Sequence, residues 1–237
     1  MGDVAVVIPA RDEAERIAAT IDAAAGIAGV DLLVVVDDGS TDATTAVARG
    51  AGALVLRHER NRGKAAALET GAAEVARRDS ADHPAPRLLL LLDADLGRSA
   101  AAAADLVPPV RIGAFDMTIA NLPAGRDVGG GRGRVVRLAA RGIHRATGAV
   151  VHQPLCGQRC LTRRAFEAAL PLAHGFGVET GMTIDVLRAG LSVCEIRCEL
   201  EHRVTGADWS GVRHRATQYA DVAAALARRI RPVSDHR

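Results

Sequence analysis

Aromatic side chains are scarce in this 237-residue chain, which holds one Trp, one Tyr and three Phe. Modules that bind single-stranded nucleic acid stack bases on aromatic platforms, so this scarcity argues against a nucleic-acid partner. No apolar run approaches the roughly 18 residues that a membrane-spanning helix needs. The first apolar run, Val4–Ile8, ends at Pro9 and follows no basic stretch, so we expect no secretory leader. We therefore expect a cytoplasmic protein, with peripheral contact at the inner face of a membrane left open.

Lysine and cysteine are also rare. Among 30 basic residues only Lys64 is a lysine, and the four cysteines form two C-x-x-x-C pairs, beginning at Cys156 and Cys194. Structural zinc usually takes C-x-x-C spacing, so the cysteines are expected to be small buried apolar residues.

Acidic residues are missing from one long stretch. Residues 128–166 contain eight arginines and no Asp or Glu, whereas the rest of the chain has 22 basic and 28 acidic residues. Such a basic island favours contact with phosphate or with an anionic surface. A solvated arginine-rich helix would have the same composition.

Apolar runs alternate with helical segments in the first half of the chain. The strands predicted there are Val4–Ile8, Leu32–Val36, Ala53–Arg57 and Leu88–Leu92. Helices are expected over 43–51 and 62–79. This alternation is typical of βαβ units, and it predicts an α/β fold with a Rossmann-like, mostly parallel sheet covered by helices on both faces.

The second half has a looser pattern. It predicts helices over 132–147, 178–189 and 212–230, and strands near 155–161 and 192–201. We expect residues 1–237 to form a single domain in two halves. Residues of about 1–120 would bind a nucleotide-sugar, and residues of about 121–237 would bind the acceptor.

Polar clusters directly follow the predicted strands, where open α/β sheets bind their ligands. Asp93-Ala94-Asp95 comes straight after Leu88–Leu92. Two carboxylates one residue apart can hold a hard divalent cation, Mg²⁺ or Mn²⁺, whose shell is completed by diphosphate oxygens. The same string alone could equally form a turn or a helix cap.

Three further clusters occupy corresponding places. Pro9–Glu13 follows the first strand, Asp37–Asp42 follows the second, and Arg62-Gly63-Lys64 opens a helix whose N-terminus favours phosphate. Asp38 suits the hydroxyl or N–H groups of a nucleoside. Each cluster alone fits ordinary turn chemistry, but four of them at four strand ends indicate one site.

The ordered series of these clusters resembles the family 2 glycosyltransferases of GT-A fold. The resemblance implies a nucleotide-sugar donor, and it implies that Asp95 acts in catalysis and binds a divalent cation between itself and the diphosphate. The implied donor-binding residues are Pro9, Ala10, Arg11, Glu13, Asp38, Gly63, Lys64, Asp93 and Ala94.

The second half narrows the resemblance to the glucosyl-3-phosphoglycerate synthase branch. It is carried by Gly133–Leu138, Gln153–Gln158, Gly175–Glu179 and Glu201-His202-Arg203. That branch implies UDP-glucose as donor, a phosphorylated acceptor and His202 as a second metal ligand. The implied catalytic residues are Glu179 and Arg159, and the implied acceptor-binding residues are Arg134, Gly157, Gln158 and Thr180.

Two departures from that branch put phosphoglycerate itself in doubt as the acceptor. Leu200 and Val204 stand where those synthases have an arginine and an asparagine that bind it. In addition, Glu179 is followed by Thr180, where many processive relatives have an Asp that acts as base. Threonine cannot accept a proton at neutral pH, so either the acceptor is an already ionised phosphate or the reaction retains configuration.

Other functions stay open at this point. Polyprenyl-phosphate sugar transferases, using GDP-mannose or UDP-glucose at a membrane surface, are the next resemblance. A lipid phosphate could be received by the basic segment of Arg132, Arg134, Arg137, Arg141 and Arg145. A degenerate nucleotide-sugar-binding module and a homodimer are further alternatives. A nucleotidyltransferase or NAD-dependent oxidoreductase would need a glycine-rich loop after the first strand, and Pro9–Glu13 contains no glycine.

Overall fold

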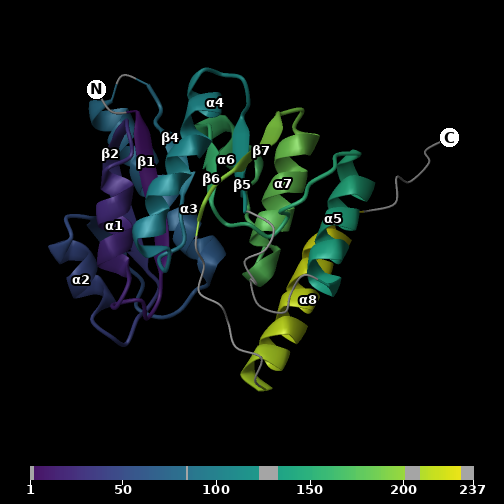
Figure 1. Ribbon diagram of the computed structural model, residues 1–237, viewed down its shortest axis with the longest axis horizontal. Coiled ribbons are helices and arrows are strands. Elements are labelled where there is room, and N and C mark those ends of the chain that lie inside the picture. The colour runs from purple at the N-terminus through teal and green to yellow at the C-terminus, as the bar shows by residue number, and fades with distance from the viewer. Residues whose placement is uncertain (1–2, 84, 123–132, 201–208, 231–237) are drawn as a thin grey trace.

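A seven-stranded sheet runs through the computed structural model, which describes residues 3–83, 85–122, 133–200 and 209–230 (Figure 1). The strand order is β3-β2-β1-β4-β6-β5-β7. Neighbouring strands are parallel except at β6, which is antiparallel to both β4 and β5. The predicted α/β fold with a mostly parallel sheet is therefore confirmed. The strands are β1 Val4–Ala10, β2 Val30–Asp37, β3 Leu54–Arg57, β4 Leu88–Leu91, β5 Met117–Asn121, β6 Arg159–Leu161 and β7 Val193–Arg197.

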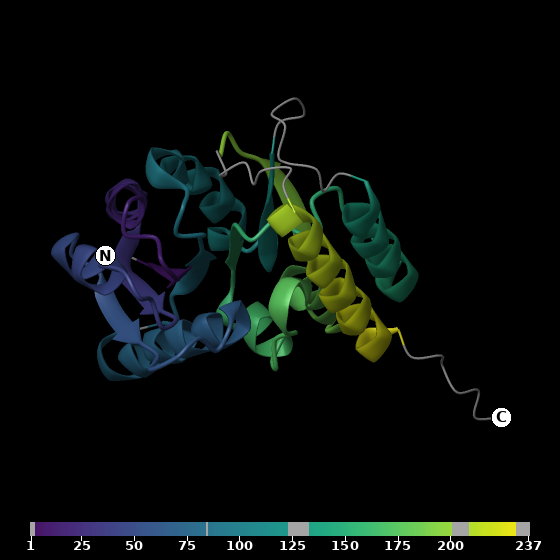
Figure 2. The same cartoon turned by 90° about the horizontal axis from the view of Figure 1, so that it is seen from below.

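Helices cover both faces of the first four strands. Helix α1 (Ile17–Ala25) packs with the 3₁₀ helix η1 (Gly97–Leu106) on one face, and α3 (Lys64–Asp82) packs on β1 and β2 from the other (Figure 2). Burial on both faces explains why β1 is a continuous apolar run rather than an alternating one. The short helix α2 (Thr44–Gly50) links β2 to β3.

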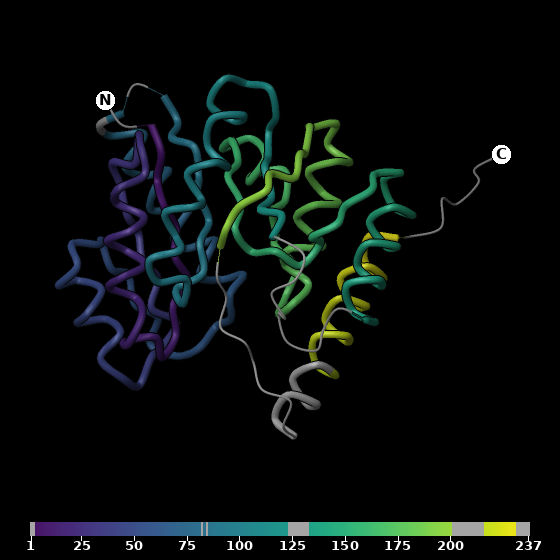
Figure 3. The backbone as a smooth tube through the Cα atoms, in the orientation of Figure 1, coloured from purple at the N-terminus to yellow at the C-terminus, as the bar shows by residue number. Residues whose placement is uncertain are grey.

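Three helices pack together at the other end of the sheet. They are α5 (Arg134–Thr147), α7 (Val178–Arg188) and α8 (Trp209–Arg229). Helices α5 and α8 lie side by side far from α1 and α2 (Figure 3). A Cβ on Gly142 of α5 would come within 2.3 Å of the Leu226 side chain, so the close approach of these two helices requires glycine there.

The sequence prediction missed five elements, β5, η1, α4 (Val107–Arg111), α6 (Arg163–Ala168) and the 3₁₀ helix η2 (Gly175–Gly177). In β5 the apolar run is interrupted by Thr118. This residue can be buried because its hydroxyl donates a hydrogen bond to the Leu106 carbonyl oxygen at 2.8 Å. The strand predicted near 155–161 begins only at Arg159, after a turn. Among the described helices, none is long and apolar enough to cross a membrane.

Candidate functional site

The polar clusters meet at the carboxyl ends of β1, β2 and β4. The chain goes from β1 to β2 on one side of β1, whereas β4 pairs on its other side. Such a reversal of strand order opens the crevice in which α/β sheets bind ligands. The arrangement explains why residues from distant parts of the sequence share one site.

Hydrogen bonds fasten the loop after β1 to the loop after β2. The Asp12 amide donates to the Ser40 hydroxyl at 3.0 Å, and the Asp12 carboxylate accepts from the Thr41 amide at 2.8 Å. The Glu13 amide donates to the Thr44 hydroxyl at 2.8 Å. Much of the Pro9–Glu13 and Asp37–Asp42 motifs thus holds the two loops in place.

Both oxygens of Asp38 are used inside the protein. They accept hydrogen bonds from the Arg62 and Gly63 amides at 2.8 and 2.7 Å, and one of them lies 2.7 Å from His58 Nδ1. Asp38 is buried. It builds the loop that leads to Lys64, and its expected contact with a nucleoside stays a prediction.

The neighbouring Asp37 has a similar structural task. Burial by itself would raise the pKa of Asp37, but hydrogen bonds from Ser40 and Thr45, together with the Arg57 charge, lower it below its usual value. The carboxylate therefore stays ionised and braces the turn after β2.

Asp93 and Asp95 follow β4 and differ in their surroundings. The Asp93 carboxylate accepts from Lys64 Nζ at 2.7 Å and from Gln158 Nε2 at 2.6 Å. Asp95 is half-buried, and its backbone oxygen accepts from Arg16 at 3.2 Å. Its carboxylate has no hydrogen bond or ion pair with the residues that the structure describes. Asp95 thus keeps its oxygen atoms for a ligand.

Lys64 links the two halves of the chain. Its ammonium lies 2.7 Å from Asp93 and 2.8 Å from Glu179 Oε1, in the first turn of α7. Burial would lower the pKa of Lys64, but the two carboxylates raise it above its usual value, so the ammonium stays charged. Gly157 lies against this group, where a Cβ would come within 2.6 Å of Lys64 Nζ and 3.0 Å of Asp93.

The Arg159 side chain is wholly buried beneath these residues. Its Nε donates to the Cys156 carbonyl oxygen and its Nη1 to the Thr183 hydroxyl, both at 2.9 Å. The Thr183 hydroxyl in turn donates to the Glu179 backbone oxygen at 2.8 Å. Burial lowers the pKa of Arg159. In this structure Arg159 supports Glu179 from within the protein.

Cys156 completes the connection to Asp93. Burial raises the pKa of Cys156 to about 12, so its thiol stays protonated and donates to Gln158 Oε1 at 3.0 Å. The contacts now form a closed circuit, which we call the hydrogen-bonded ring. Its members are Lys64, Asp93, Gln158, Cys156, Arg159, Thr183 and Glu179.

The remaining predicted site residues lie in several places. Pro9 and Ala10 end β1, Arg11 is exposed beside Asp12 at 3.6 Å, and the Ala94 carbonyl oxygen accepts from Thr20 at 2.8 Å.

Two of the predicted acceptor-binding residues form no hydrogen bond or ion pair with the ring, among the residues that the structure describes. Thr180 is wholly buried and its hydroxyl has no partner among the described residues, while Arg134 is exposed at the start of α5. His202, the predicted second metal ligand, lies outside the described residues.

Sequence reasoning missed Arg16 and Thr20 of the α1 segment. Both bind the backbone of the Asp93–Asp95 loop, and the Thr20 hydroxyl also accepts from the Gly97 amide at 2.8 Å. Their spacing of four residues places them on the same helix side, which was the available signal. Cys156 and Thr183 gave no such signal because they act through buried contacts.

The residues present fit a divalent cation. The half-buried Asp95 offers hard oxygen atoms that have no partner among the described residues, beside a ring whose two carboxylates are balanced by Lys64 and Arg159. Mg²⁺ commonly takes one or two carboxylates and fills its shell with water and phosphate oxygens. Among the described residues, no three His, Cys, Asp or Glu side chains form a complete protein cage.

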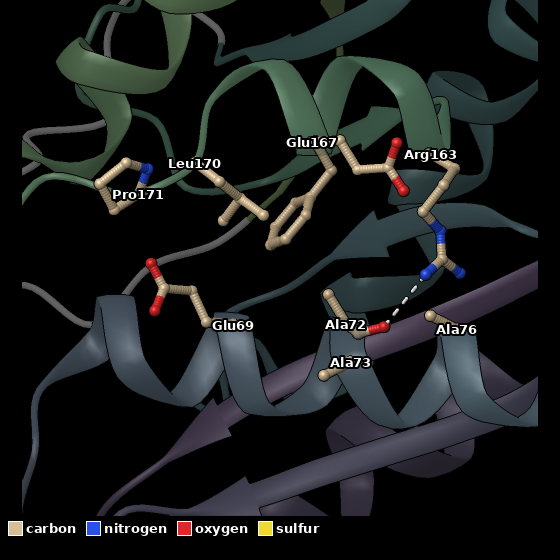
Figure 4. Close-up of a pocket in the computed structure, with 9 residues that line it drawn as sticks. Glu69, Ala72, Ala73, Ala76, Arg163, Glu167, Leu170 and Pro171 are labelled. Carbon is tan, nitrogen blue, oxygen red and sulfur yellow. Dashed lines mark hydrogen bonds between the residues drawn. The ribbon is translucent and has the colours of Figure 1, made fainter.

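A separate cavity of about 450 Å³ lies between α3 and α6 (Figure 4). None of the strand-end residues lines it, and its walls are mostly apolar, so it is distinct from the candidate site. The lining residues are Glu69, Ala72, Ala73, Ala76, Arg163, Phe166, Glu167, Leu170 and Pro171.

The curated proteins similar to this chain include glycosyltransferases. The glycosyltransferase AglJ of Haloferax volcanii is 29% identical in an alignment 211 residues long, which covers 86% of this chain and 65% of that protein. The glucosyl-3-phosphoglycerate synthase of Mycolicibacterium paratuberculosis is 32% identical in an alignment 220 residues long, which covers 84% of this chain and 65% of the synthase. The chain thus spans less than two thirds of the length of either relative.

Solved structures of a Mycobacterium tuberculosis synthase share the fold. Its glucosyl-3-phosphoglycerate synthase with Mn²⁺, uridine diphosphate and phosphoglyceric acid gives a TM-score of 0.77 at 27% identity, covering 98% of this chain and 80% of that one. The structure of the same synthase with Mg²⁺ and uridine diphosphate gives a TM-score of 0.77 at 26% identity. That match covers 98% of this chain and 81% of the synthase chain.

The family resemblance in the sequence is thereby confirmed, including its proximity to the synthase branch. The model of glycosyl transferase family 2 matches residues 5–168, more than half of the chain, and these include the Asp93–Asp95 loop and Gln158. The chain therefore belongs to glycosyl transferase family 2.

Proposed function

We propose that this chain transfers a hexose from a UDP-sugar, with UDP-glucose favoured, to a phosphorylated acceptor, and that the transfer depends on Mg²⁺ or Mn²⁺. The observation that carries the proposal is the pair Asp93 and Asp95 at the switch point of the sheet, with Lys64 bridging Asp93 to Glu179. The synthase structures with UDP and Mn²⁺ or Mg²⁺ support the choice of donor and cation. A further structure of that synthase contains UDP-glucose.

Charge explains why a cation is needed. Asp93, Asp95 and Glu179 supply three carboxylates, whereas Lys64 and Arg159 supply two cationic groups, so one negative charge is left uncompensated. A diphosphate alone would meet an excess of negative charge at this place. Asp95 would hold the cation, with His202 as the proposed second ligand, and the bound cation neutralises the charge that develops on the leaving diphosphate.

The protein groups around Asp95 then have separate tasks. Gln158 and Lys64 fix the Asp93 carboxylate, and Lys64 adds a permanent positive charge close to where the diphosphate would lie. Glu179 holds Lys64 from the acceptor side. Each group is oriented before the donor binds, which reduces the reorganisation needed in the transition state.

We propose a chemical class of acceptor rather than a particular compound. Leu200 is buried and its side chain has neither charge nor hydrogen-bond donor, so it cannot replace the arginine that binds phosphoglycerate in the synthase branch. An acceptor that attacks through an ionised phosphate oxygen is favoured, because such a nucleophile has no proton to lose and Thr180 provides no general base. A polyprenyl phosphate would satisfy the same requirement.

The test is release of UDP from UDP-glucose with Mn²⁺, measured separately with 3-phosphoglycerate and with a polyprenyl phosphate as acceptor. We expect Asp95→Asn to reduce turnover by at least 100-fold, since the metal contributes several kcal/mol to lowering the barrier. The matched control is Asp22→Asn, at an exposed carboxylate on α1.

Two results would contradict the proposal. One is full turnover of Asp95→Asn, which would remove the carboxylate from the reaction. The other is the absence of turnover with both acceptors together with no binding of UDP. That second result would favour the degenerate binding module.

A further inference from the structure

Helix α5 carries a row of arginines on one face. Arg134, Arg137, Arg141 and Arg145 are all exposed, and the helix contains no Asp or Glu. At 100° per residue, the four lie within an arc of roughly 80°, and the row is about 16 Å long. We call this row the arginine face of α5.

None of these four arginines forms an ion pair with the described residues. Buried or half-buried arginines elsewhere do form them, such as Arg163 with Asp79 and Arg87 with Asp31. A surface that lines up like charges without compensating acids is unfavourable in the isolated protein. An anionic partner would relieve that repulsion.

The opposite side of α5 is firmly anchored. Val135, Ala139, Gly142 and Ile143 are buried, and α5 packs against both α7 and α8. The glycine brings α8 into close contact, so the helix is held as a rigid support for its arginine face.

The surroundings of α5 suit a lipid surface. Val150, two residues beyond the C-cap Gly148, is 72% exposed, and Tyr219 on the adjacent α8 is 47% exposed. Tyrosine is enriched at membrane interfaces, and basic side chains close to a membrane surface are attracted to anionic lipids.

We propose that the arginine face of α5 docks the protein on an anionic membrane, with the guanidinium groups contacting lipid phosphates. A membrane is favoured over a nucleic acid because it meets one face only, whereas the rest of the chain carries 28 acidic against 22 basic residues. A long polyanion such as DNA would extend beyond the basic residues 128–166 and would be repelled by the acidic rest of the chain.

Docking would also bear on the acceptor. Helix α5 packs on α7, whose first turn carries Glu179 of the hydrogen-bonded ring. A protein held through its arginine face would therefore have the candidate site on the other side of α5 from the lipid, behind a single helix layer. The docking itself goes beyond the proposed function, because membrane binding needs no sugar transfer.

The experiment is co-sedimentation of the full chain with vesicles of phosphatidylcholine, with and without phosphatidylglycerol. We expect binding only to the vesicles with phosphatidylglycerol, weakening as salt is added. The variant Arg137→Gln/Arg141→Gln/Arg145→Gln is expected to bind about 100-fold more weakly, at roughly fivefold per arginine near an anionic surface. Arg134 is left unchanged because it is a predicted acceptor-binding residue.

The matched control is Arg49→Gln/Arg60→Gln/Arg164→Gln, which removes three exposed arginines from other elements. The proposal is overturned if the chain ignores phosphatidylglycerol, if both triple variants lose binding equally, or if a DNA duplex competes as well as the vesicles do. A normal melting temperature establishes that each variant is folded. UDP release with a water-soluble acceptor tests the transferase proposal independently of membrane binding.

Discussion

At the scale of single residues, the role of Arg159 depends on its burial. An arginine that is wholly buried loses its hydration, which costs free energy of folding. Such a residue is expected to make up for that cost by orienting other groups. Arg159 holds the Cys156 carbonyl oxygen on one side and Thr183, which binds the Glu179 backbone, on the other. We therefore regard it as a positioning residue for the ring.

Arg159→Met should lower kcat by about tenfold and leave the KM for UDP-glucose nearly unchanged, because an interaction that only orients the reacting groups mainly affects the transition state. Steady-state kinetics on a variant with a normal circular dichroism spectrum would show this. Arg159→Lys keeps one donor and should recover part of the rate. A rise in the donor KM with unchanged kcat would instead mean that Arg159 contributes to donor binding.

Gly157 is the second residue whose identity is set by its neighbours. Its missing Cβ would come within 2.6 Å of Lys64 Nζ, so Gly157→Ala must displace the ammonium from Asp93. We expect at least a tenfold loss of UDP release with at most about 2 kcal/mol lost in stability, the usual cost of overpacking. Gly50→Ala is the control, because no atom lies within 4 Å of the added carbon there. Equal activity of the two variants would contradict the close packing of Lys64.

At the scale of elements, the strand-end clusters were predictable and the support beneath them was not. Alternating apolar runs and helices imply parallel strands, whose carboxyl ends share one edge, and this brings Asp93 and Lys64 together. Arginine is seldom buried, so nothing in the sequence indicated an inward-facing Arg159. The Asp37–Asp42 string is compatible with ligand binding and with turn formation, and only the contacts of Asp38 show its internal use.

Helix α3 carries a pH-sensitive contact on its outer side. Two hydrogen bonds from Arg77, and one from Arg78, lower the pKa of Glu74 to about 2 from an ordinary 4.5. A lowered folded-state pKa stabilises the fold above pH 4.5, and this contribution is lost as pH falls from 4.5 towards 2.

Glu74→Gln should therefore reduce the free energy of unfolding by about 1 kcal/mol at pH 7, a value typical of exposed or partly exposed ion pairs. The difference from the parent protein should vanish as pH falls towards 2. Urea unfolding at several pH values measures it, with Glu15→Gln at an exposed site as control. A difference that is constant across pH would exclude the ion pairs as its cause.

At the scale of the whole molecule, one sheet connects the two halves of the chain. The pairing of β4 with β6 joins strands from both, and Lys64 adds an ion pair from α3 to Glu179 on α7 across the same seam. Energy gained by binding a donor on the first half should therefore stabilise the second half as well.

A thermal unfolding experiment tests this coupling. UDP with Mn²⁺ at 100 times the dissociation constant should add about 2.7 kcal/mol to the stability of the folded state. Because the sheet is continuous, we expect a single calorimetric transition whose midpoint temperature rises. The rise should be much smaller with UDP alone, since the carboxylates of the site repel the free diphosphate.

Lys64→Met should weaken the coupling between the two halves by removing the ion pair between them. Two separate transitions in the parent chain, with only one of them raised by UDP and Mn²⁺, would mean that the halves unfold independently and that the seam between β4 and β6 does not couple them.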